Sequence, residues 1–428
     1  MTWPERASSA AGPSLTVGSR KPDNGRKAMP APETQFKLVF GFAALGHFLF
    51  HVLVALYLTI VLVLEVDWQH SYDELIALWT FGALLLGLAA PLAGWLSDHW
   101  GAGKVMVIYF LGIGTATALC GLAAGPDSLA VFLGILGFFG AIYHPVGTAW
   151  LVANARARGK SIAALGLFGS LGTALAALIA GSLTDLVSWR AAFIVPGLVA
   201  VASGLWLWIL MSKGRIVERK QDIQPQPEPS RTDVRRAFAA LAITMSLTTV
   251  IYYAFTTMLP KWLNLELGAL LGQGYLGLGA VITAVYLLGA ASQLIGGHLS
   301  DKGAAKAAYV ASYALKVAAF VAACVITGWP VLIAAVLVVF AFDFAAPVEN
   351  VLIARFSPGR RRGLAYGIRN GIAIVAAPLG VQLVALLYAP GSGFQSLLLV
   401  LGGLALLILF AALALPSDRP RNAVESEA

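Results

Sequence analysis

The sequence predicts an all-α membrane protein with twelve transmembrane helices arranged as two six-helix bundles. Of its 428 residues, 59% are hydrophobic and only 12% are charged, whereas average soluble domains carry about 25% charged residues. Apolar stretches of about 20 residues, the length that crosses a bilayer as a helix, follow one another along the chain. One short loop pattern occurs in both halves. This composition excludes a water-soluble enzyme, a nucleic-acid-binding module and a disordered scaffold.

The predicted helices follow from the alternation of apolar and polar sequence. Residues 1–35 are polar and rich in Pro, Ser and Gly, and they predict a disordered tail. Residues 212–236 are charged and Pro-rich and predict a linker between a bundle at 36–211 and a second bundle at 237–416, with a second tail at 417–428. The predicted spans are 38–64, 74–96, 105–124, 129–153, 162–184, 190–211, 237–260, 274–299, 307–328, 330–354, 364–388 and 394–416.

The net charge of +8 indicates the orientation of the chain rather than an acidic partner. If the N-terminus is cytoplasmic, nearly all of the 29 Lys and Arg residues fall in the tails, the linker and the loops on that side. The first loop on the other side is acidic, with Glu65, Asp67, Asp73 and Glu74. Because loops rich in Lys and Arg stay in the cytoplasm, we expect both termini there. The predicted location is the bacterial inner membrane, or a membrane derived from it, with several passes.

A glycine-rich loop pattern connects the second predicted span to the third and recurs between the eighth and the ninth. Its first copy runs from Gly94 to Gly101 as Gly-Trp-Leu-Ser-Asp-His-Trp-Gly, with Asp98 inside it. Its second copy runs from Gly297 to Asp301 as Gly-His-Leu-Ser-Asp. Two halves with matching landmarks are typical of a duplicated transport fold.

These loops resemble the loop 2–3 signature of the major facilitator superfamily, and the resemblance covers about residues 36–416 through helix count, orientation and linker. It implies that each aspartate latches the cytoplasmic side by engaging the start of a helix in the other half. Asp98 is then expected near Gly363, and Asp301 near Ser161. An anion near a helix N-terminus is favoured by about 0.3–1 kcal/mol.

Two of the predicted helices indicate which branch of the superfamily the chain resembles. The segment from Tyr143 to Gly147, which contains a His-Pro step, is similar to the fourth helix of fosmidomycin-resistance-like members. The arginine that drug antiporters usually carry before Gly140 is missing, as is the proline of their fifth-helix signature, which argues against that branch. The fifth span instead has glycines spaced for close helix packing, namely Gly166, Gly169 and Gly172.

Three histidines within the predicted spans are candidate functional residues, because an ionisable group at the bilayer centre costs about 2.5–3.5 kcal/mol and needs a partner or a purpose. His47 and His144 are expected about 14 Å from the inner ends of their helices, and His51 lies one turn beyond His47. The resemblance implies that these helices line a central cavity. We therefore expect the histidines to couple protons or to bind substrate or metal. The structural alternative is a packed histidine bonded to a carbonyl group.

Four further charged residues are predicted to pair across neighbouring helices. Lys316 and Asp343 are expected at equal depth, and so as an ion pair that is structural or functional, while Asp343 is also a candidate for proton coupling. Glu349 and Arg369 lie near the inner ends of their helices and are expected to pair as an inner gate.

A polar stripe on the helix at 237–260 is able to hydrogen-bond a ligand. It consists of Tyr252, Tyr253, Thr256 and Thr257; on a surface facing lipid the same tyrosines would only anchor the helix. Lys261, at the outer end of that helix, is expected to extend toward the lipid headgroups.

These patterns predict a secondary active transporter that moves a small solute by alternating access and is coupled to protons. Two substrates stay open: a small polar or anionic compound that is exported, as the fosmidomycin-resistance similarity implies, or a metal such as iron, as in the similar-looking magnetosome-associated permeases. The alternative from another class is a non-transporting membrane sensor or assembly factor. Because no nucleophile–base arrangement and no phosphate-binding loop occurs, we expect neither an enzyme nor a cofactor. The expected partners are the solute or ion and membrane lipid, not nucleic acid.

Overall fold

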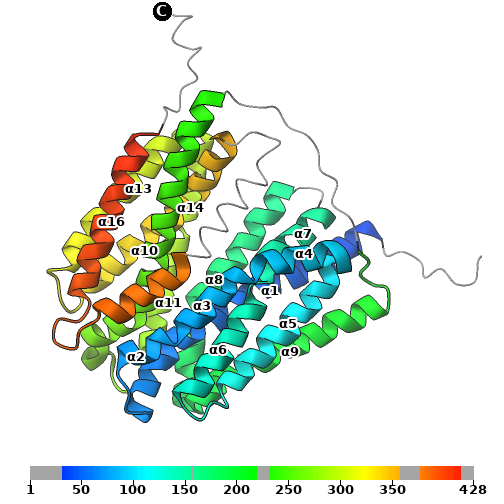
Figure 1. Cartoon of the computed structure of the whole chain (residues 1–428), viewed down its shortest axis with the longest axis horizontal. Coiled ribbons are helices and arrows are strands. Elements are labelled where there is room, and N and C mark those ends of the chain that lie inside the picture. The colour runs from blue at the N-terminus through cyan, green and yellow to red at the C-terminus, as the bar shows by residue number, and fades with distance from the viewer. Residues whose placement is uncertain (1–30, 156–157, 219–230, 357–375, 416–428) are drawn as a thin grey trace, which may run out of the picture.

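The computed structural model describes residues 31–155, 158–218, 231–356 and 376–415. Within these ranges the chain is almost entirely helical, and the single bridge between Ala389 and Gly393 is the only strand-like pairing described. Figure 1 shows the helices in two groups, with α1 to α9 on one side of the molecule and α10 to α16 on the other. The all-α architecture that the composition predicts is confirmed.

The first group begins with one long helix and continues with shorter ones that cross the molecule back and forth. Proline stands in the first turn of three of these helices, where its missing N–H has no helical partner to lose. Gly101 ends α4 with φ of 94°, a conformation that a side chain would strain. The elements are α1 (Pro32–Asp67), α2 (Tyr72–Ala77), α3 (Trp79–Leu88), α4 (Ala90–Trp100), α5 (Ala102–Cys120), α6 (Pro126–Gly140), the π-helical turn η1 (Tyr143–Gly147), α7 (Thr148–Asn154), α8 (Arg158–Leu186) and α9 (Trp189–Ser212).

The second group contains the longest helix of the described chain, the 41-residue α10. A further helix, which carries no label in Figure 1, covers Ala376–Leu387. The other elements of this group are α10 (Arg231–Leu271), α11 (Leu276–Ala290), α12 (Ser292–Asp301), α13 (Ala305–Ala323), α14 (Pro330–Phe356) and α16 (Gln395–Leu413).

Ten helices among the described residues are long and apolar enough to span a membrane. They correspond to ten of the predicted spans; Tyr72–Trp100, Pro126–Asn154 and Leu276–Asp301 are each built from shorter helices in sequence. The predicted span at 237–260 lies within α10, and of the span at 364–388 the structure describes Ala376–Leu387. The count of twelve, the division at 212–236 and the orientation of the termini stay predictions.

Glycines allow several helix pairs in the first group to approach closely. A Cβ added at Gly137 of α6 would lie 2.0 Å from the carbonyl oxygen of Gly82 in α3. Gly114 of α5 and Gly197 of α9 face each other, and a Cβ on either would lie 2.6–2.7 Å from the carbonyl oxygen of the other. Within a bilayer, where lipid removes most of the hydrophobic drive between helices, such close backbone packing is a main source of association.

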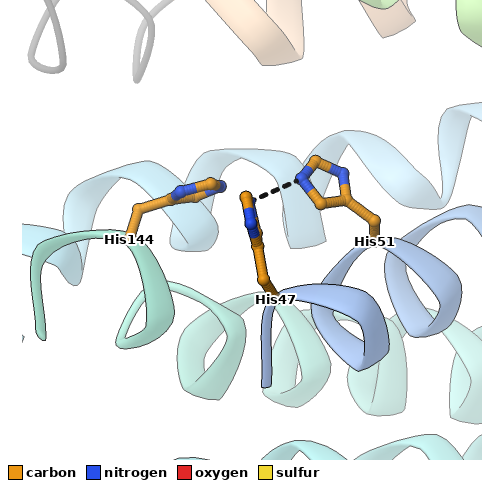
Figure 2. Close-up of side chains that lie close together, drawn as sticks. All are labelled: His47, His51 and His144. Atoms are coloured by element: carbon orange, nitrogen blue, oxygen red, sulfur yellow. Dashed lines mark hydrogen bonds between the residues drawn. The ribbon is translucent and has the colours of Figure 1, made fainter. Parts of the chain in front are cut away.

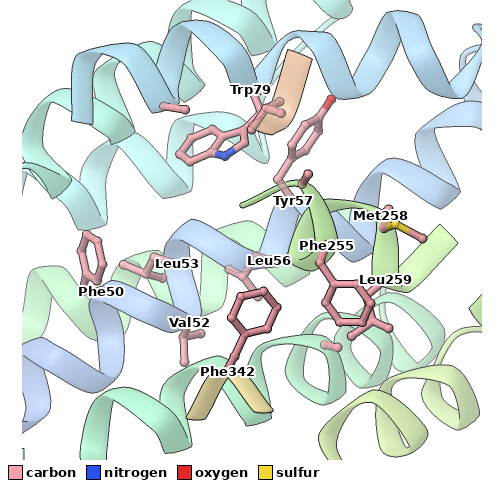
Figure 3. Packing of buried hydrophobic residues seen from close by; sticks show 14 of the residues in the cluster. Phe50, Val52, Leu53, Leu56, Tyr57, Trp79, Phe255, Met258, Leu259 and Phe342 are labelled. Carbon is pink, nitrogen blue, oxygen red and sulfur yellow. The ribbon is translucent and has the colours of Figure 1, made fainter. Parts of the chain in front are cut away.

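An apolar core joins the two groups of helices. Figure 3 shows members of this core from both groups, among them Leu53, Leu56 and Tyr57 of α1, Phe255 of α10 and Phe342 of α14. All five side chains are at most 8% exposed. The core therefore connects the helices that carry the candidate site residues.

Polar contacts hold the two groups of helices together at one end of the molecule, which we call the far end. The opposite end, where Val217 just after α9 accepts a hydrogen bond from Gln35 near the start of α1 (2.9 Å), is called the linker end. At the far end, Lys261 of α10 pairs with Glu65 of α1 at 2.6 Å. Lys261 is only 7% exposed, so the expectation that it extends toward lipid headgroups is wrong. Its ammonium is held by a carboxylate from the other group instead.

A second far-end contact is a helix cap made across the two groups. The carboxylate of Asp185, at the end of α8, accepts hydrogen bonds of 2.7 Å from the backbone N–H groups of Tyr275 and Leu276 at the start of α11. A Cβ on Gly274, whose φ is 89°, would lie 2.5 Å from this carboxylate. This is the kind of latch that the resemblance assigns to Asp98 and Asp301, made here by another aspartate at the far end.

Candidate functional site

A cavity of about 510 Å³ lies between the two groups of helices. It is bounded by α1, η1 and α8 from the first group and by α10, α11 and α14 from the second. A smaller cavity of about 100 Å³ continues it and shares several of its lining residues. The large cavity is lined by His47, His51, His144, Gly166, Gly169, Ser170, Thr173, Met245, Thr248, Thr249, Tyr252, Tyr253, Phe255, Thr256, Tyr286, Val339, Phe342, Asp343, Ala345, Ala346 and Glu349.

The three histidines meet on the wall that the first group forms. One ring nitrogen from each of His47, His51 and His144 lies within 4.8 Å of the others. Figure 2 shows the three imidazoles converging, two from α1 and one from η1. His47 and His51 are partly buried, whereas His144 is exposed to the cavity. The spacing along the helix and the estimated depth thus identified three residues that lie close together in the fold. Their roles stay predictions.

Hydrogen bonds fix the tautomer of His47. Its Nδ1 lies 2.8 Å from the carbonyl oxygen of Leu165 in α8, and since a carbonyl only accepts, Nδ1 carries the proton. In the neutral ring Nε2 then holds a lone pair, which accepts from Nε2–H of His51 at 3.3 Å. The lone pair of His47 is therefore directed at the other imidazoles.

The local sequence explains why the imidazole of His47 is held in place. Gly169 of α8 lies so close that a Cβ there would be 2.5 Å from the ring. On another side the ring of Tyr143 stacks on it, with 5.0 Å between centroids and 15° between planes. The phenol of Tyr143 in turn donates to the carbonyl oxygen of Ala43 at 2.7 Å. Of the predicted packing glycines, Gly169 and Gly172 pack on α1, while Gly166 lines the cavity.

His144 reaches the cavity from a π-helical turn. Pro145 follows it directly and has no N–H to donate to a regular helix ladder. Single π turns inside helices widen the backbone and occur often at functional sites. The His-Pro step thus corresponds to a distinct local backbone, which turns the imidazole toward the α1 histidines.

The second group forms a wall of different character. Asp343 of α14 accepts a hydrogen bond from Nε2 of Gln293 at 3.1 Å. The same amide nitrogen donates to Oγ of Ser170 in α8 at 2.9 Å, so it bridges the two groups in the middle of the molecule. Tyr252 and Tyr253 of α10 line the cavity as the polar stripe predicts. Glu349 also lines it and is only 6% exposed.

The predicted ion pair between Lys316 and Asp343 is not formed. Lys316 is completely buried, and within the described part of the chain its Nζ finds no hydrogen-bond partner. Nζ lies instead 3.8 Å from the ring centroid of Tyr313 and 4.5 Å from that of Phe342. The prediction considered only the depth of the lysine and the aspartate along their helices. The orientation of the helices about their own axes directs the ammonium toward the aromatic rings instead.

The predicted gate and latch residues lie toward the linker end. Asp98 and Asp301 are both exposed. The start of α8, which the resemblance assigns to Asp301, adjoins residues 156–157 outside the described ranges, so this latch stays a prediction. Arg369, the expected partner of Glu349, lies outside the described residues, as does Gly363.

The glycines of the predicted latch loops fall into two kinds. Gly94 and Gly297 have open space where a Cβ would stand. Gly101 instead approaches Glu218 so closely that a Cβ would lie 2.6 Å from its carboxyl group. The carboxylate of Glu218 accepts from the backbone N–H of Lys104 at the start of α5 (3.2 Å). Gly101 therefore permits a contact with the residues after α9 rather than with the other half.

Among the polar residues near the cavity that sequence reasoning missed are Gln293, Ser170 and Tyr286. Gln293 is an amide within an otherwise apolar span, which is a signal that the search for ionisable groups did not include. Ser170 and Tyr286 are common in membrane helices, and only the fold shows that both line the cavity.

A bundle of membrane-spanning helices with a polar cavity between its two groups defines the class of a membrane transport protein. The chain belongs to the Major Facilitator Superfamily, whose sequence profile matches residues 43–285 and 267–428. The resemblance of the paired loops to this family is thereby confirmed.

The chain is also similar to proteins that are named as transporters or efflux pumps. It is 29% identical to the probable actinorhodin transporter of Streptomyces coelicolor over 31% of its length, and 30% identical to the multidrug efflux pump LfrA of Mycolicibacterium smegmatis over 43%. It is 29% identical to a putative metabolite transport protein of Haemophilus influenzae over 52%. The matches span 24%, 32% and 57% of these relatives. Similarity to drug exporters exists despite the missing antiporter arginine and proline.

Solved structures share the fold. A bacterial homologue of the human lysosomal transporter Spinster, in an inward-facing and unoccupied conformation, superposes with a TM-score of 0.67 at 15% identity, covering 89% of this chain and 95% of that one. The occupied inward-facing structure of such a homologue gives a TM-score of 0.65 with similar coverage.

Proposed function

We propose that this secondary transporter exports a small polar organic solute through the cavity between its two groups of helices, by alternating access and in exchange for protons. The observation that carries the proposal is the cavity itself. It lies between the two groups, it holds polar side chains from both, and the cross-group contacts at Lys261 and Asp185 lie beyond it at the far end. Rearrangement of the two groups would expose the same side chains to the opposite end.

The lining of the cavity supports an organic solute. Tyr252, Tyr253, Phe255 and Phe342 offer aromatic surface, and the imidazoles and hydroxyl groups offer hydrogen bonds. The names of similar proteins, which include a probable actinorhodin transporter and a puromycin resistance protein, also refer to organic compounds.

Asp343 is the residue to which we assign proton coupling. It is a carboxylate in the middle of a membrane-spanning helix, it lines the cavity, and through Gln293 it is connected to Ser170 of the other group. A change of charge on Asp343 is therefore felt both in the cavity and at a contact between the two groups. Those are the two elements that coupling has to link.

The proposed orientation follows from the distribution of basic residues. The linker end is assigned to the cytoplasm of a bacterial inner membrane, so that the cavity of this conformation serves the cytoplasmic side. Single cysteines introduced at exposed loop positions of each end, labelled from outside intact cells with a membrane-impermeant maleimide, test this assignment. Labelling is expected at the far end only.

Reconstitution in liposomes tests the function. Puromycin and tetracenomycin C, compounds that appear in the names of relatives, are suitable first probes, followed by the compounds to which a deletion strain becomes sensitive. Vesicles with an imposed pH gradient should move a solute of this panel and dissipate the gradient as they do so. Solute movement that ignores the gradient would contradict proton coupling. A protein that binds a solute but never moves it would favour the sensor alternative.

A second candidate function is transport of a metal such as iron. One observation favours it, the convergence of three imidazoles on the cavity wall. A comparison of metal accumulation in cells that express the chain and in cells that lack it distinguishes this function from solute export. A metal transporter should change the metal content of the cells.

A further inference from the structure

We infer that His47, His51 and His144 form a binding site for a divalent transition-metal ion of borderline softness, of which Zn²⁺ is the type. The inference goes beyond solute transport, because the site would hold the ion whether or not the ion is moved. Four observations carry it: the spacing of the nitrogens, the bond that orients His47, the packing around the rings and the kind of donor.

The spacing of the ring nitrogens fits a small tetrahedral ion. Zn–N bonds are about 2.0–2.1 Å long, so two nitrogens on a tetrahedral ion lie about 3.4 Å apart. Nε2 of His47 and Nε2 of His51 lie 3.3 Å apart. The third imidazole, that of His144, offers a nitrogen within 4.8 Å of both, so all three donors lie close enough together to hold one ion.

The hydrogen bond from His47 to Leu165 is the outer contact that metal-binding histidines usually have. Such a ligand donates its other ring N–H to a carbonyl or carboxylate, which fixes the tautomer and aims the free lone pair at the ion. Nδ1–H of His47 makes this bond at 2.8 Å, and its lone pair on Nε2 faces His51. For His51 to bind through Nε2, its proton moves to Nδ1, which leaves the ring neutral.

The surroundings of the rings restrict their movement. Tyr143 stacks on His47, and Gly169 brings α8 against its other side. The ring of Phe50 packs edge-on against both His51 and His144, at centroid distances of 5.0 and 4.7 Å. Ligands held in this way lose little rotational freedom when an ion binds.

The donor set determines which ion fits. Three neutral nitrogens without a carboxylate in the cluster suit Zn²⁺, Cu²⁺, Ni²⁺ and Co²⁺, whereas Mg²⁺ and Ca²⁺ require oxygen ligands. For one site, affinity rises along the series from Fe²⁺ to Cu²⁺, so iron is expected to bind more weakly than nickel or copper. Because the cavity adjoins the cluster, the fourth coordination position is open to water or to a donor atom of a solute.

Metal binding to the full-length protein in detergent tests the inference directly. The protein is purified on a tag without histidine, stripped with a chelator and titrated with ZnCl₂ by calorimetry and with CoCl₂ by absorption spectroscopy. We expect one equivalent of Zn²⁺ and, with Co²⁺, the intense visible bands of a tetrahedral ion. Single variants His47→Gln, His51→Gln and His144→Gln should each weaken Zn²⁺ binding by at least about 100-fold, since loss of only an outer-shell partner costs about 10–100-fold.

The chain offers matched controls, because the structure places His99 and His298 at exposed positions away from the cavity. His99→Gln and His298→Gln should leave the affinity unchanged. Zn²⁺ binding that survives in the triple variant of His47, His51 and His144, or a Co²⁺ spectrum without tetrahedral bands, would overturn the site. Both readouts are binding measurements, so absence of solute transport in liposomes would refute the proposed function without touching this result.

Discussion

The two walls of the central cavity differ in the kind of chemistry they offer. The wall from the first group presents three imidazoles close together, of which those of His47 and His51 are joined by a hydrogen bond and that of His47 is also bonded to a backbone carbonyl. The wall from the second group presents the carboxyl groups of Asp343 and Glu349, with the ammonium of Lys316 buried behind Phe342. We therefore propose that metal binding belongs to the first wall, with its imidazole lone pairs, and proton coupling to the second wall, with its exchangeable charge.

The largest effect is expected from removing the charge of the second wall. Asp343→Asn keeps the size of the side chain but removes its ability to carry a proton. Transport driven by a pH gradient should fall at least about 100-fold, the lower range for loss of a proton-transferring group. Solute uptake into proteoliposomes measures it. Asp127→Asn, an exposed change at the start of α6, is the control and should leave uptake unaltered.

The next largest effect is expected on the first wall. In Gly169→Ala the new Cβ would lie 2.5 Å from the ring of His47, which cannot retreat without leaving Leu165 or Tyr143. We expect Zn²⁺ affinity to fall about 10–100-fold, as for loss of an outer-shell partner. Calorimetry measures it, and Gly41→Ala, with open space around it, is the matched variant. Equal affinity in both would show that α8 does not position His47.

A smaller effect is expected at the far end, where the two groups are held together. Glu65→Gln removes the charge that pairs with the buried ammonium of Lys261. Because Glu65 is itself partly exposed, we expect the closed far end to lose on the order of 1–2 kcal/mol, between the values for exposed and buried pairs. A cysteine placed in the smaller cavity should then react faster with a maleimide added from the far side. Asp67→Asn, exposed at the same end, should not change that rate.

The smallest effect is expected from Lys316→Met. If Lys316 were paired with Asp343, breaking the pair would destabilise the protein by about 3–5 kcal/mol. Two aromatic rings lie against the ammonium, whereas the carboxyl groups of Asp343 and Glu349 act on it without a hydrogen bond. The loss of ring contacts worth about 0.5–2 kcal/mol is then offset by removing a buried charge. The melting temperature in detergent should thus stay near that of the parent protein and of Lys302→Met, an exposed control. A drop of many degrees in the melting temperature would contradict this account and support the predicted ion pair between Lys316 and Asp343.

Hydropathy and repeats predicted the class of fold, because a bilayer imposes the length and the apolar character of each span. Depth along a helix also brought His47, His51 and His144 together correctly. The same depth argument failed for Lys316, since the sequence does not show the rotation of a helix about its axis when apolar residues cover every side. Lys261 was misjudged for a related reason: a residue near the membrane surface can face lipid or the other half of the protein.

The contact between Gln293, Ser170 and Asp343 could not be predicted at all. It joins residues far apart in sequence, and its members are ordinary polar residues whose proximity is created by the packing of three helices. Similarly, Asp185 at the end of α8 gave no sign that it caps α11 in the other group. Contacts of this type depend on how the two groups are docked.

Solute counterflow by Asp343→Asn, in proteoliposomes without a pH gradient, tests the division of labour between the walls most directly. Counterflow requires binding and rearrangement but no net movement of protons. If the carboxylate serves coupling while other residues hold the solute, counterflow should persist at close to the parent rate although gradient-driven transport is lost. Loss of counterflow together with gradient-driven transport, in a variant that is folded and still binds Zn²⁺, would contradict the account, because Asp343 would then be part of the solute site itself.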